Sequence, residues 1–406
     1  MRTRGDGFDG RRAAGVSYCG GVTEEPEGPG FDAASVVTDA LVTCEVDDDE
    51  VTVTASDVET DDVSGLSAPA ASSVAARAFG PLRGLIERVP ASSSGAPRPP
   101  LSGSAFRTTD SLGRSADALD VIANPVQPAP SYLGIYHINL GAGRFALCLA
   151  ASRDLKTWRK IADIDPTGGS MGTIRGLSDG GFLVAYEAQG PTTPGHKTAT
   201  NVRLRYYRDP VALLNGQATE QRTLPRRISL TNEGTPDFRS IAWRGSLATS
   251  RIVLGFHYLD RGPASKPFKL AVDRQARGTL DKNRWSVVVD AGIDRALSRM
   301  GFHGNHGARR QFHFPPGGKT WRIYEAQKLV NVTGSWRVLL YDNSARTLKA
   351  LGIQTPNRST SFANPTINVL PSPHPAGGRA FVVSMFVFGA GAGAGESGQL
   401  VYYHDL

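Results

Sequence analysis

The strongest constraint on the fold is an order of segments that repeats over the last two-thirds of the chain. Five units each contain short apolar segments, from SYLGIYHIN and FALCLAA in the first to AFVVSMFVFG and QLVYYHD in the last. The third segment of each unit is read as closing on an aspartate; these are Asp154, Asp209, Asp273, Asp342 and Asp405. They recur every 55–69 residues, enough chain for four short antiparallel strands. This period predicts an all-β protein, a five-bladed β-propeller.

Another segment precedes the apolar segments of each unit. These segments read ANPVQ, GSMGTIRGL, EGTPDFRSI, GARRQFHF and ANPTINVL. We expect each to form the innermost strand of a blade, with Gly or Pro where the backbone is crowded beside the central channel. The aspartates that close the third segments are expected to cap turns by accepting hydrogen bonds from nearby backbone amides.

The N-terminal part of the chain differs in composition from the rest. Residues 1–62 carry a net charge of −12 and the remaining residues +19. Stretches such as EVDDDE and PASSSGAPRPPLSGS are poor at forming a core. We therefore expect residues 1–115 to be a disordered, acidic and Ala/Ser/Pro-rich region, and residues 116–406 to form the propeller.

The last unit ends at Asp405, directly after its third strand, so its outer strand must come from elsewhere in the chain. The segment FRTTDSLGRSADALDVI, before the first unit, is the expected donor, and it predicts order around Leu119–Ile122. Such a strand would close the ring and cover an exposed sheet edge.

The stretch SRDLKTW, from Ser152 to Trp158, follows the apolar segment FALCLAA. We interpret it as the turn from the third strand to the outer strand of the first blade, with Asp154 bonding the turn and Trp158 packing between blades. An apolar strand followed by Ser-x-Asp-Leu-x-x-Trp resembles the blade signature of the arabinanase-like five-bladed β-propeller glycoside hydrolases, the family 43 type. The resemblance covers about residues 120–406.

The resemblance implies a set of catalytic carboxyl groups. In that family an Asp opens blade one as base, an Asp opens blade two and tunes pKa, and a Glu opens blade three as acid. Glu233, in NEGTPDF, occupies the acid position, but blade one is read as opening with Asn124 and blade two with SMGT. The usual catalytic Asp positions are therefore not matched in this interpretation.

In a propeller the first strand of each blade starts at the channel mouth where the second strand ends. Residues expected at the strand-one starts are Asn124, Ser170, Arg175, Glu233, Asp237, His306, Arg309 and Asn364. Residues expected at the strand-two ends are His137, Glu187, Asp260 and Glu325. From these sets we predict substrate-binding roles for Asn124, His137, Arg175, Asp237, His306, Arg309 and Asn364.

The tetrapeptide YEAQ occurs twice, and it places Glu187 and Glu325 at the same mouth as Glu233. Hydrolysis of a glycosidic bond needs one protonated and one ionised carboxyl group. We therefore take Glu233, Glu187 and Glu325 as catalytic candidates. The alternative is that the YEAQ glutamates form salt bridges with arginines such as Arg175 or Arg309 and order the mouth.

The histidines and arginines at the mouth suggest ligand contacts. His303 and His306 are three residues apart, but without a third ligand we predict no metal site and assign His306 to hydrogen bonding with substrate. Arg309 and Arg310, with Arg175 and Arg239, are candidates for bidentate binding of the carboxylates or sulfates of an acidic sugar. The alternative for each arginine is a hydrogen bond to a backbone carbonyl.

The sequence predicts a glycoside hydrolase that cleaves a plant or microbial polysaccharide at the channel mouth with a Glu general acid. The alternative is a non-catalytic propeller that binds an acidic glycan. Expected partners are polysaccharides or oligosaccharides, acidic ones included, with no cofactor, nucleic acid or membrane, and a monomeric state. A polysaccharide substrate implies an extracellular location, although the N-terminus lacks the apolar core of a secretory signal.

Overall fold

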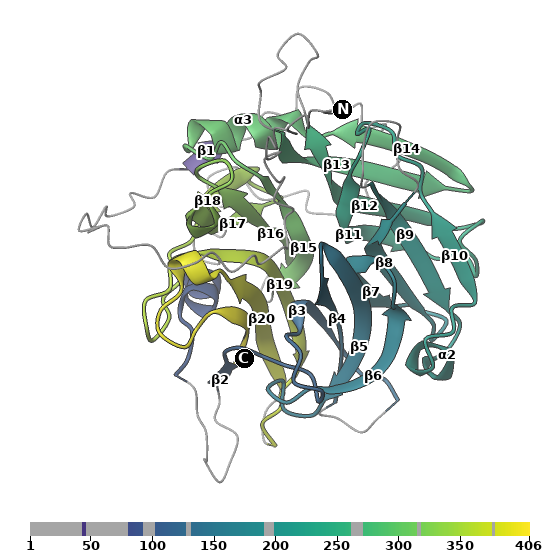
Figure 1. Ribbon diagram of the computed structural model, residues 1–406, viewed down its shortest axis with the longest axis horizontal. Helices are drawn as coiled ribbons and strands as arrows, with labels where there is room; N and C mark the ends of the chain where they lie inside the picture. Colours follow the sequence, from purple (N-terminus) through teal and green to yellow (C-terminus); the bar gives the residue numbers. More distant parts are fainter. Residues whose placement is uncertain are drawn as a thin grey trace, which may run out of the picture.

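The computed structural model describes residues 43–45, 80–91, 102–126, 131–190, 199–260, 271–314, 318–375 and 378–406. These residues form five antiparallel sheets arranged in a ring (Figure 1). The protein is therefore a five-bladed β-propeller, as the repeated segments predict. Within the described residues, no helix is long and apolar enough to cross a membrane.

The first three blades each consist of four consecutive strands, counted outward from the axis. Their strands are β3 (Asp117–Ala123), β4 (Tyr132–Gly141), β5 (Arg144–Ser152) and β6 (Arg159–Asp165) in blade I; β7 (Gly169–Gly176), β8 (Phe182–Gln189), β9 (Thr200–Tyr207) and β10 (Glu220–Thr223) in blade II; and β11 (Glu233–Ala242), β12 (Arg251–Asp260), β13 (Val272–Asp281) and β14 (Arg284–Val289) in blade III. A short helix α2 (Pro210–Leu214) follows β9.

The last two blades each take one strand from the N-terminal part of the chain. Blade IV contains β15 (His306–Phe314), β16 (Lys319–Gln327), β17 (Trp336–Asp342) and β18 (Thr347–Ala350), and β1 (Thr43–Glu45) pairs with β18 at its outer edge; blade V contains β19 (Phe362–Pro371), β20 (Arg379–Val387), β21 (Gly398–Asp405) and β2 (Ser102–Ala105). Helix α3 (Ala291–Arg299) and the one-turn helices η1 (Thr333–Ser335) and η2 (Gly389–Gly391) lie in connections.

The middle strands are apolar on both faces because neighbouring blades pack against both sides of each sheet. In β20 every residue except Arg379 is buried. This packing explains why AFVVSMFV reads as a continuous apolar run and not as an alternating one.

The turn SRDLKTW adopts the conformation that its sequence predicts. Asp154 Oδ1 accepts hydrogen bonds from the backbone amides of Lys156 at 2.9 Å and Thr157 at 2.7 Å. Trp158 is buried in a cluster that also contains side chains of blade V, such as Tyr403. The tryptophan therefore joins the first blade to the last.

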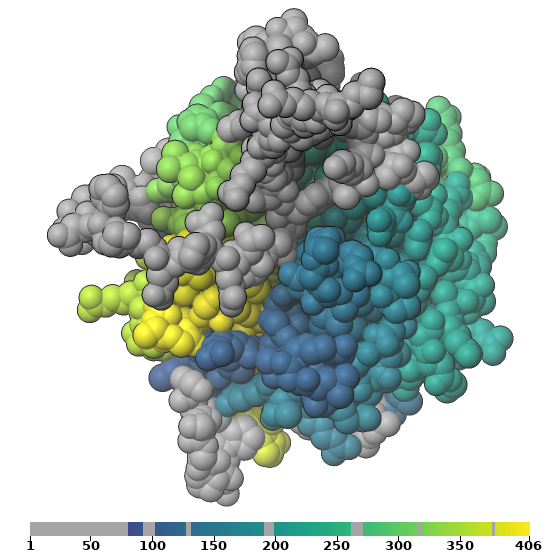
Figure 2. Space-filling view, in the orientation of Figure 1, coloured from purple at the N-terminus to yellow at the C-terminus, as the bar shows by residue number. Residues whose placement is uncertain are grey.

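Strand β2 closes the ring by pairing antiparallel with β21, from Ser102 opposite His404 to Ala105 opposite Val401. In Figure 2 the blue N-terminal residues lie against the yellow C-terminal blade. The predicted donor segment was wrong, because the closing strand precedes it; Leu119–Ile122 instead belongs to β3, the innermost strand of blade I. A strand in that position is ordered by blade packing and is unavailable as an outer strand.

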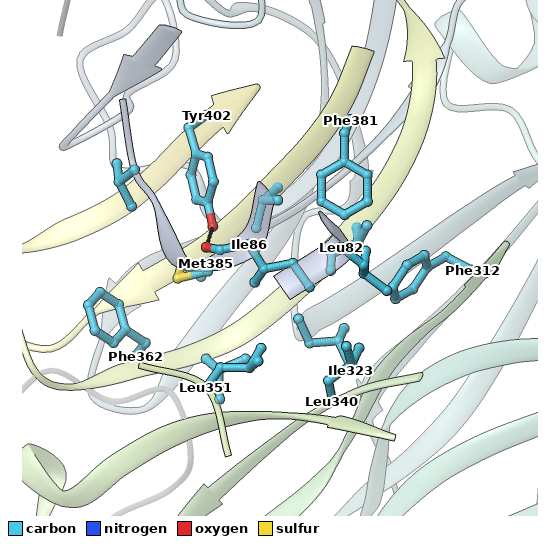
Figure 3. Close-up of a cluster of buried hydrophobic side chains, with 14 of the residues drawn as sticks. Leu82, Ile86, Phe312, Ile323, Leu340, Leu351, Phe362, Phe381, Met385 and Tyr402 are labelled. Carbon is cyan, nitrogen blue, oxygen red and sulfur yellow. Dashed lines mark hydrogen bonds between the residues drawn. The ribbon is translucent and has the colours of Figure 1, made fainter. Parts of the chain in front are cut away.

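A helical segment over residues 80–87 adds to this closure. Leu82 and Ile86 are buried in the cluster between blades IV and V, near Phe381 and Tyr402 (Figure 3). The hydroxyl of Tyr402 donates a hydrogen bond to the backbone carbonyl of Ile86. The boundary expected at residue 116 is therefore too late, since residues 80–91 and 102–105 pack with the propeller. The disorder predicted for the remainder of residues 1–115 falls mostly outside the described residues.

The third strand of blade III also differs from expectation. Asp273 stands near the start of β13, and the strand continues to Asp281. Asp273 therefore lies at the end of the blade where the innermost strand begins, whereas Asp209, Asp342 and Asp405 close or follow their third strands as expected.

Candidate functional site

The innermost strands all begin at one mouth of the central channel, here called the start mouth. Register pairs the start of each innermost strand with a residue of the second strand; the pairs are Asp117 with His137, Ser170 with Glu187, Gly234 with His257, Gly307 with Glu325 and Ala363 with Phe386. Four ionisable second-strand side chains thus hold equivalent positions in blades I to IV. This ring contains His137, Glu187 and Glu325, which the sequence places at the mouth.

Every innermost strand has a β-bulge just after its start. In blades I, II, III and V the bulge contains a residue other than glycine with positive φ, namely Ala118, Met171, Thr235 and Asn364. Bulges turn the strand and re-aim side chains. In blade IV the unpaired bulge residue is Arg309.

Side chains of one blade bind the bulge of the next blade. Met171 N donates to His137 Nδ1 at 3.3 Å, and Thr235 Oγ1 donates to Glu187 Oε2 at 3.3 Å. The backbone amide of Asn364 donates to Glu325 Oε2. The YEAQ glutamates therefore hold adjacent blades together, and their main partners are bulge residues and not the arginines considered from the sequence.

The pKa values of these two glutamates are raised. Loss of hydration on burial, with a smaller contribution from the negative charge of Asp273, raises the pKa of Glu187 to about 7. Burial raises the pKa of Glu325 to about 7 as well, against the opposing effect of Arg309. Near neutral pH each carboxyl group is therefore close to half protonated, a state from which a proton can be donated.

Glu233 lies at the start of β11 and is buried. Its Oε1 accepts three backbone hydrogen bonds, from Arg227 and Ile228 at 2.6 Å and from Ser229 at 3.0 Å. This carboxylate fixes the loop that leads into blade III, so Glu233 has a structural function whatever its chemistry.

Blade I opens with Asp117, so the reading of Asn124 as its first channel residue was wrong. Asn124 follows the end of β3, at the opposite end of the strand, and its Oδ1 accepts a hydrogen bond from Val126 N at 3.1 Å. Asp117 is half-buried, accepts a hydrogen bond from the hydroxyl of Ser115, and has its pKa raised to about 6 by burial. The blade-one position that the family resemblance assigns to a base therefore holds a carboxyl group.

Two other predicted mouth residues lie deeper in the channel. Asp237 pairs in register with Gly255 in the middle of β11, and its Oδ2 is 3.2 Å from Arg239 Nε. Arg175 is the penultimate residue of β7, where Nη1 lies 3.8 Å from Asp120 Oδ2. The expected positions were wrong because β7 and β11 begin at the first residue of their motifs, so that Arg175 is the seventh residue of its strand and Asp237 the fifth.

Asp120 is a buried charge that the sequence interpretation missed. Its Oδ2 accepts hydrogen bonds from Arg310 Nη1 and Thr173 Oγ1, both at 2.8 Å, and Asn368 Nδ2 donates to Oδ1 at 3.3 Å. These partners come from blades II, IV and V, so Asp120 ties four blades together below the mouth. The spacing of Asp117 and Asp120 in ADALDVIA is the signal that could have identified this strand.

His303 and His306 lie in different environments at the mouth. His306 is buried with Nε2 2.8 Å from Asp294 Oδ1 of α3, whereas His303 is exposed. In the part of the chain that the structure describes, no three His, Cys, Asp or Glu side chains form a cluster that could hold a metal ion.

The fold and the site together define a five-bladed propeller whose start mouth carries carboxyl groups from adjacent blades. No protein-family model matches the sequence, and no curated protein matches it. Similar solved structures include a glycoside hydrolase, with 13% identity, a TM-score of 0.48, and coverage of 76% of this chain and 92% of that chain.

Two further solved structures illustrate the same low similarity. The Penicillium chrysogenum α-L-arabinanase complexed with arabinobiose has 12% identity, a TM-score of 0.42, and coverage of 74% of this chain and 97% of its own. An N-acetylgalactosamine deacetylase from F. plautii, in complex with blood group B trisaccharide, has 12% identity, a TM-score of 0.44, and coverage of 71% and 89%. Identities this low concern the fold and not the activity.

Proposed function

We propose that this protein is a glycoside hydrolase that acts at the start mouth. The observation that carries the proposal is the pair of half-buried carboxyl groups on adjacent blades, Asp117 in blade I and Glu187 in blade II. Both have raised pKa values, about 6 for Asp117 and about 7 for Glu187. Hydrolysis of a glycosidic bond needs one ionised and one protonated carboxyl group, and these two groups fit that requirement between pH 6 and 7.

In this proposal Asp117 is the base and Glu187 the proton donor. Asp117 has the lower pKa and stands where the resembled family has its base. Glu187 keeps its proton to higher pH and is more exposed than Glu325. Glu233, the acid implied by the resemblance, is the competing donor, although its Oε1 is occupied by three backbone amides.

The test is hydrolysis of arabinan, xylan and polygalacturonan by the full-length protein and by Asp117→Asn, Glu187→Gln and Glu233→Gln. We expect Asp117→Asn and Glu187→Gln each to lower kcat by about 10²–10⁴-fold, the range for loss of a general acid or base. Activity should rise as Asp117 ionises near pH 6 and fall as Glu187 deprotonates near pH 7.

Matched controls come from the outer strands of the same two blades. Asp163 in blade I has an exposed side chain, and Glu220 in blade II lies on β10. Asp163→Asn and Glu220→Gln should leave kcat unchanged. Hydrolysis lost only in Glu233→Gln would move the donor to blade III, and no hydrolysis of any glycan by the wild-type protein would reject an enzymatic role on these substrates.

The second candidate is a non-catalytic propeller that binds an acidic glycan. The observation that favours it is that Glu187, Glu233 and Glu325 all bind backbone or side-chain groups of the propeller, which gives each a structural role. Salt-sensitive binding of polygalacturonan without turnover would support this candidate. Both candidate functions include an extracellular location and a monomeric state. Size-exclusion chromatography with light scattering tests whether the protein is a monomer.

A further inference from the structure

Arg309 occupies an unusual position at the start of the innermost strand of blade IV. In β15, Ala308 pairs with Tyr324 and Arg310 pairs with Ile323, so Arg309 is the extra residue of the bulge. Its side chain is buried, with 1% exposure. Burial has the largest effect on the pKa values of His137, His257 and Glu325: it lowers the pKa of each histidine and raises that of the glutamate. The positive charge of Arg309 lowers all three pKa values. The charge of Arg309 also acts on Glu187 in blade II, so the guanidinium lies within electrostatic reach of blades I to IV.

Two hydrogen-bond donors of Arg309 have no acceptor among the described residues. Nε and Nη1 are both buried and without a hydrogen-bond partner. Among the carboxyl groups that share this mouth, Glu187 Oε2 accepts a hydrogen bond from Thr235 and Glu325 Oε2 accepts one from Asn364 N. Leaving charged donors buried and unpaired is costly, so an acceptor from outside the chain is expected at this guanidinium.

The neighbouring charges indicate what kind of acceptor would fit. Arg310 is paired with Asp120 at 2.8 Å and Arg239 with Asp237 at 3.2 Å. The buried aspartates Asp120 and Asp237 thus form ion pairs with other arginines. Within the described residues, Arg309 forms no such ion pair. Glu187 and Glu325 balance the charge of Arg309 only in part near neutral pH, because burial raises the pKa of each to about 7. An anion from outside would complete the balance, and a carboxylate matches the planar fork of a guanidinium.

We propose that Arg309 binds a carboxylate at the start mouth, supplied by an acidic sugar or by a small free acid. The inference uses the same mouth as the proposed hydrolase but does not require hydrolysis. The two sources share one chemistry, recognition of a single carboxylate by Nε and Nη1, and they differ in whether the rest of a sugar adds affinity.

Binding at this position should be coupled to proton uptake. A bound anion would lie near Glu187 and Glu325, and the other charged or titratable groups around it are Asp237, Asp273, His137, His257, His306 and Arg239. Added negative charge favours the protonated form of a neighbouring carboxyl group. Affinity should therefore fall as pH rises through 7, by at most about tenfold per pH unit for each coupled proton.

The experiment is isothermal titration calorimetry on the full-length protein with sodium acetate, D-galacturonate and D-galactose at pH 6, 7 and 8. Each titration is run in two buffers of different ionisation enthalpy, which reports the protons taken up. We expect binding of acetate and galacturonate but not galactose, with Arg309→Gln weakening binding by at least about tenfold, as expected for loss of a charged hydrogen bond. Tighter binding of galacturonate than acetate would assign the site to a sugar; equal affinity would assign it to a free acid.

Two variants keep the test independent of folding. Arg309→Lys keeps the charge but loses the planar fork, so it should bind carboxylates more weakly than wild type while remaining folded. Arg299→Gln removes an exposed charge from α3 and should change affinity by less than about twofold. Because Arg309 lacks an internal partner, Arg309→Gln should melt no lower than wild type in the absence of ligand.

Several outcomes would overturn the inference. These are equal carboxylate affinity in wild type and Arg309→Gln, a large drop in melting temperature for Arg309→Gln, or a crystal structure at high acetate with only water on Nε and Nη1. The proposed function is tested separately from this inference. Hydrolysis of neutral glycans without carboxylate binding would contradict only the present inference. Carboxylate binding without hydrolysis would contradict only the proposed enzymatic activity.

Discussion

Single side chains at the start mouth combine structural and chemical roles. Glu325 holds the bulge of blade V through Asn364 N, and the same burial that makes this bond effective raises its pKa to about 7. His137 shows the opposite sign, since burial, followed by the charge of Arg309, lowers its pKa to about 3 and keeps the ring neutral. The mouth therefore disfavours charge on both residue types, as expected where hydration is lost.

This electrostatic arrangement predicts a pH-dependent stability for Glu325. The folded-state pKa of about 7 lies above the ordinary value of 4.5, so the native state binds the proton more tightly than the unfolded state. The contribution of Glu325 to the free energy of unfolding is fully present below pH 4.5 and is lost as pH rises through 7. The loss is roughly 3 kcal/mol at most, since one pKa unit corresponds to about 1.4 kcal/mol.

Glu325→Gln should therefore be about as stable as wild type at pH 4.5 and more stable at pH 8. Urea denaturation at both pH values measures the difference, with Glu220→Gln on an outer strand as control. A variant that is less stable at pH 8 than at pH 4.5, relative to wild type, would show that the ionised carboxylate stabilises the fold.

At the scale of elements, the innermost strands are fixed by close contact between each bulge and the preceding blade. A Cβ atom at Gly307 would overlap the ring of His257, and one at Gly234 would overlap the carboxyl group of Glu187. Glycine at these positions allows adjacent blades to approach. The inner-strand glycines are therefore requirements of packing at the mouth.

Gly307→Ala should destabilise the protein by about 1–3 kcal/mol, the usual cost of overpacking a buried site. Gly84, in the helix over residues 80–87, is the matched control because a Cβ there meets nothing within 4 Å. Gly84→Ala should be neutral or stabilising by about 0.5–1 kcal/mol, since alanine favours helix. Denaturant midpoints measure both changes, and equal effects of the two substitutions would contradict close packing at Gly307.

At the scale of the whole molecule, the ring depends on residues that precede the first blade. Strand β2 covers the outer edge of β21, and the helix over residues 80–87 buries Leu82 and Ile86 between blades IV and V. The closure joins the two ends of the propeller through both hydrogen bonds and apolar packing. Losing it would expose a sheet edge and an apolar surface together.

A chain that begins at Gly80 should therefore fold and unfold cooperatively, and one that begins at Phe106 should not. The shorter chain lacks both β2 and the helix, so we expect a melting temperature at least about 10 °C lower, or aggregation on expression. Thermal melts followed by circular dichroism make the comparison, and Leu82→Ala, with an expected loss of about 2–5 kcal/mol, tests the helix alone. Equal melting temperatures for the two chains would mean that the ring closes without these elements.

The sequence by itself determined the number of blades, the all-β class and the turn around Asp154 and Trp158. These features depend on local spacing: apolar segments recur with a fixed period, and a short acidic side chain bonds the amides that directly follow it. Glu187 and Glu325 could also be placed at the mouth, because the repeated YEAQ marks equivalent strand positions.

Only the tertiary structure decided which strand opens blade I, which strand closes the ring and which groups face Arg309. ADALDVIA and ANPVQ both fit the pattern of an innermost strand, and the choice between Asp117 and Asn124 depends on packing against blades II and V. The surroundings of Arg309 come from four blades that are far apart in the chain. Local sequence carries no record of such contacts, because burial and charge at the mouth arise only when the ring closes.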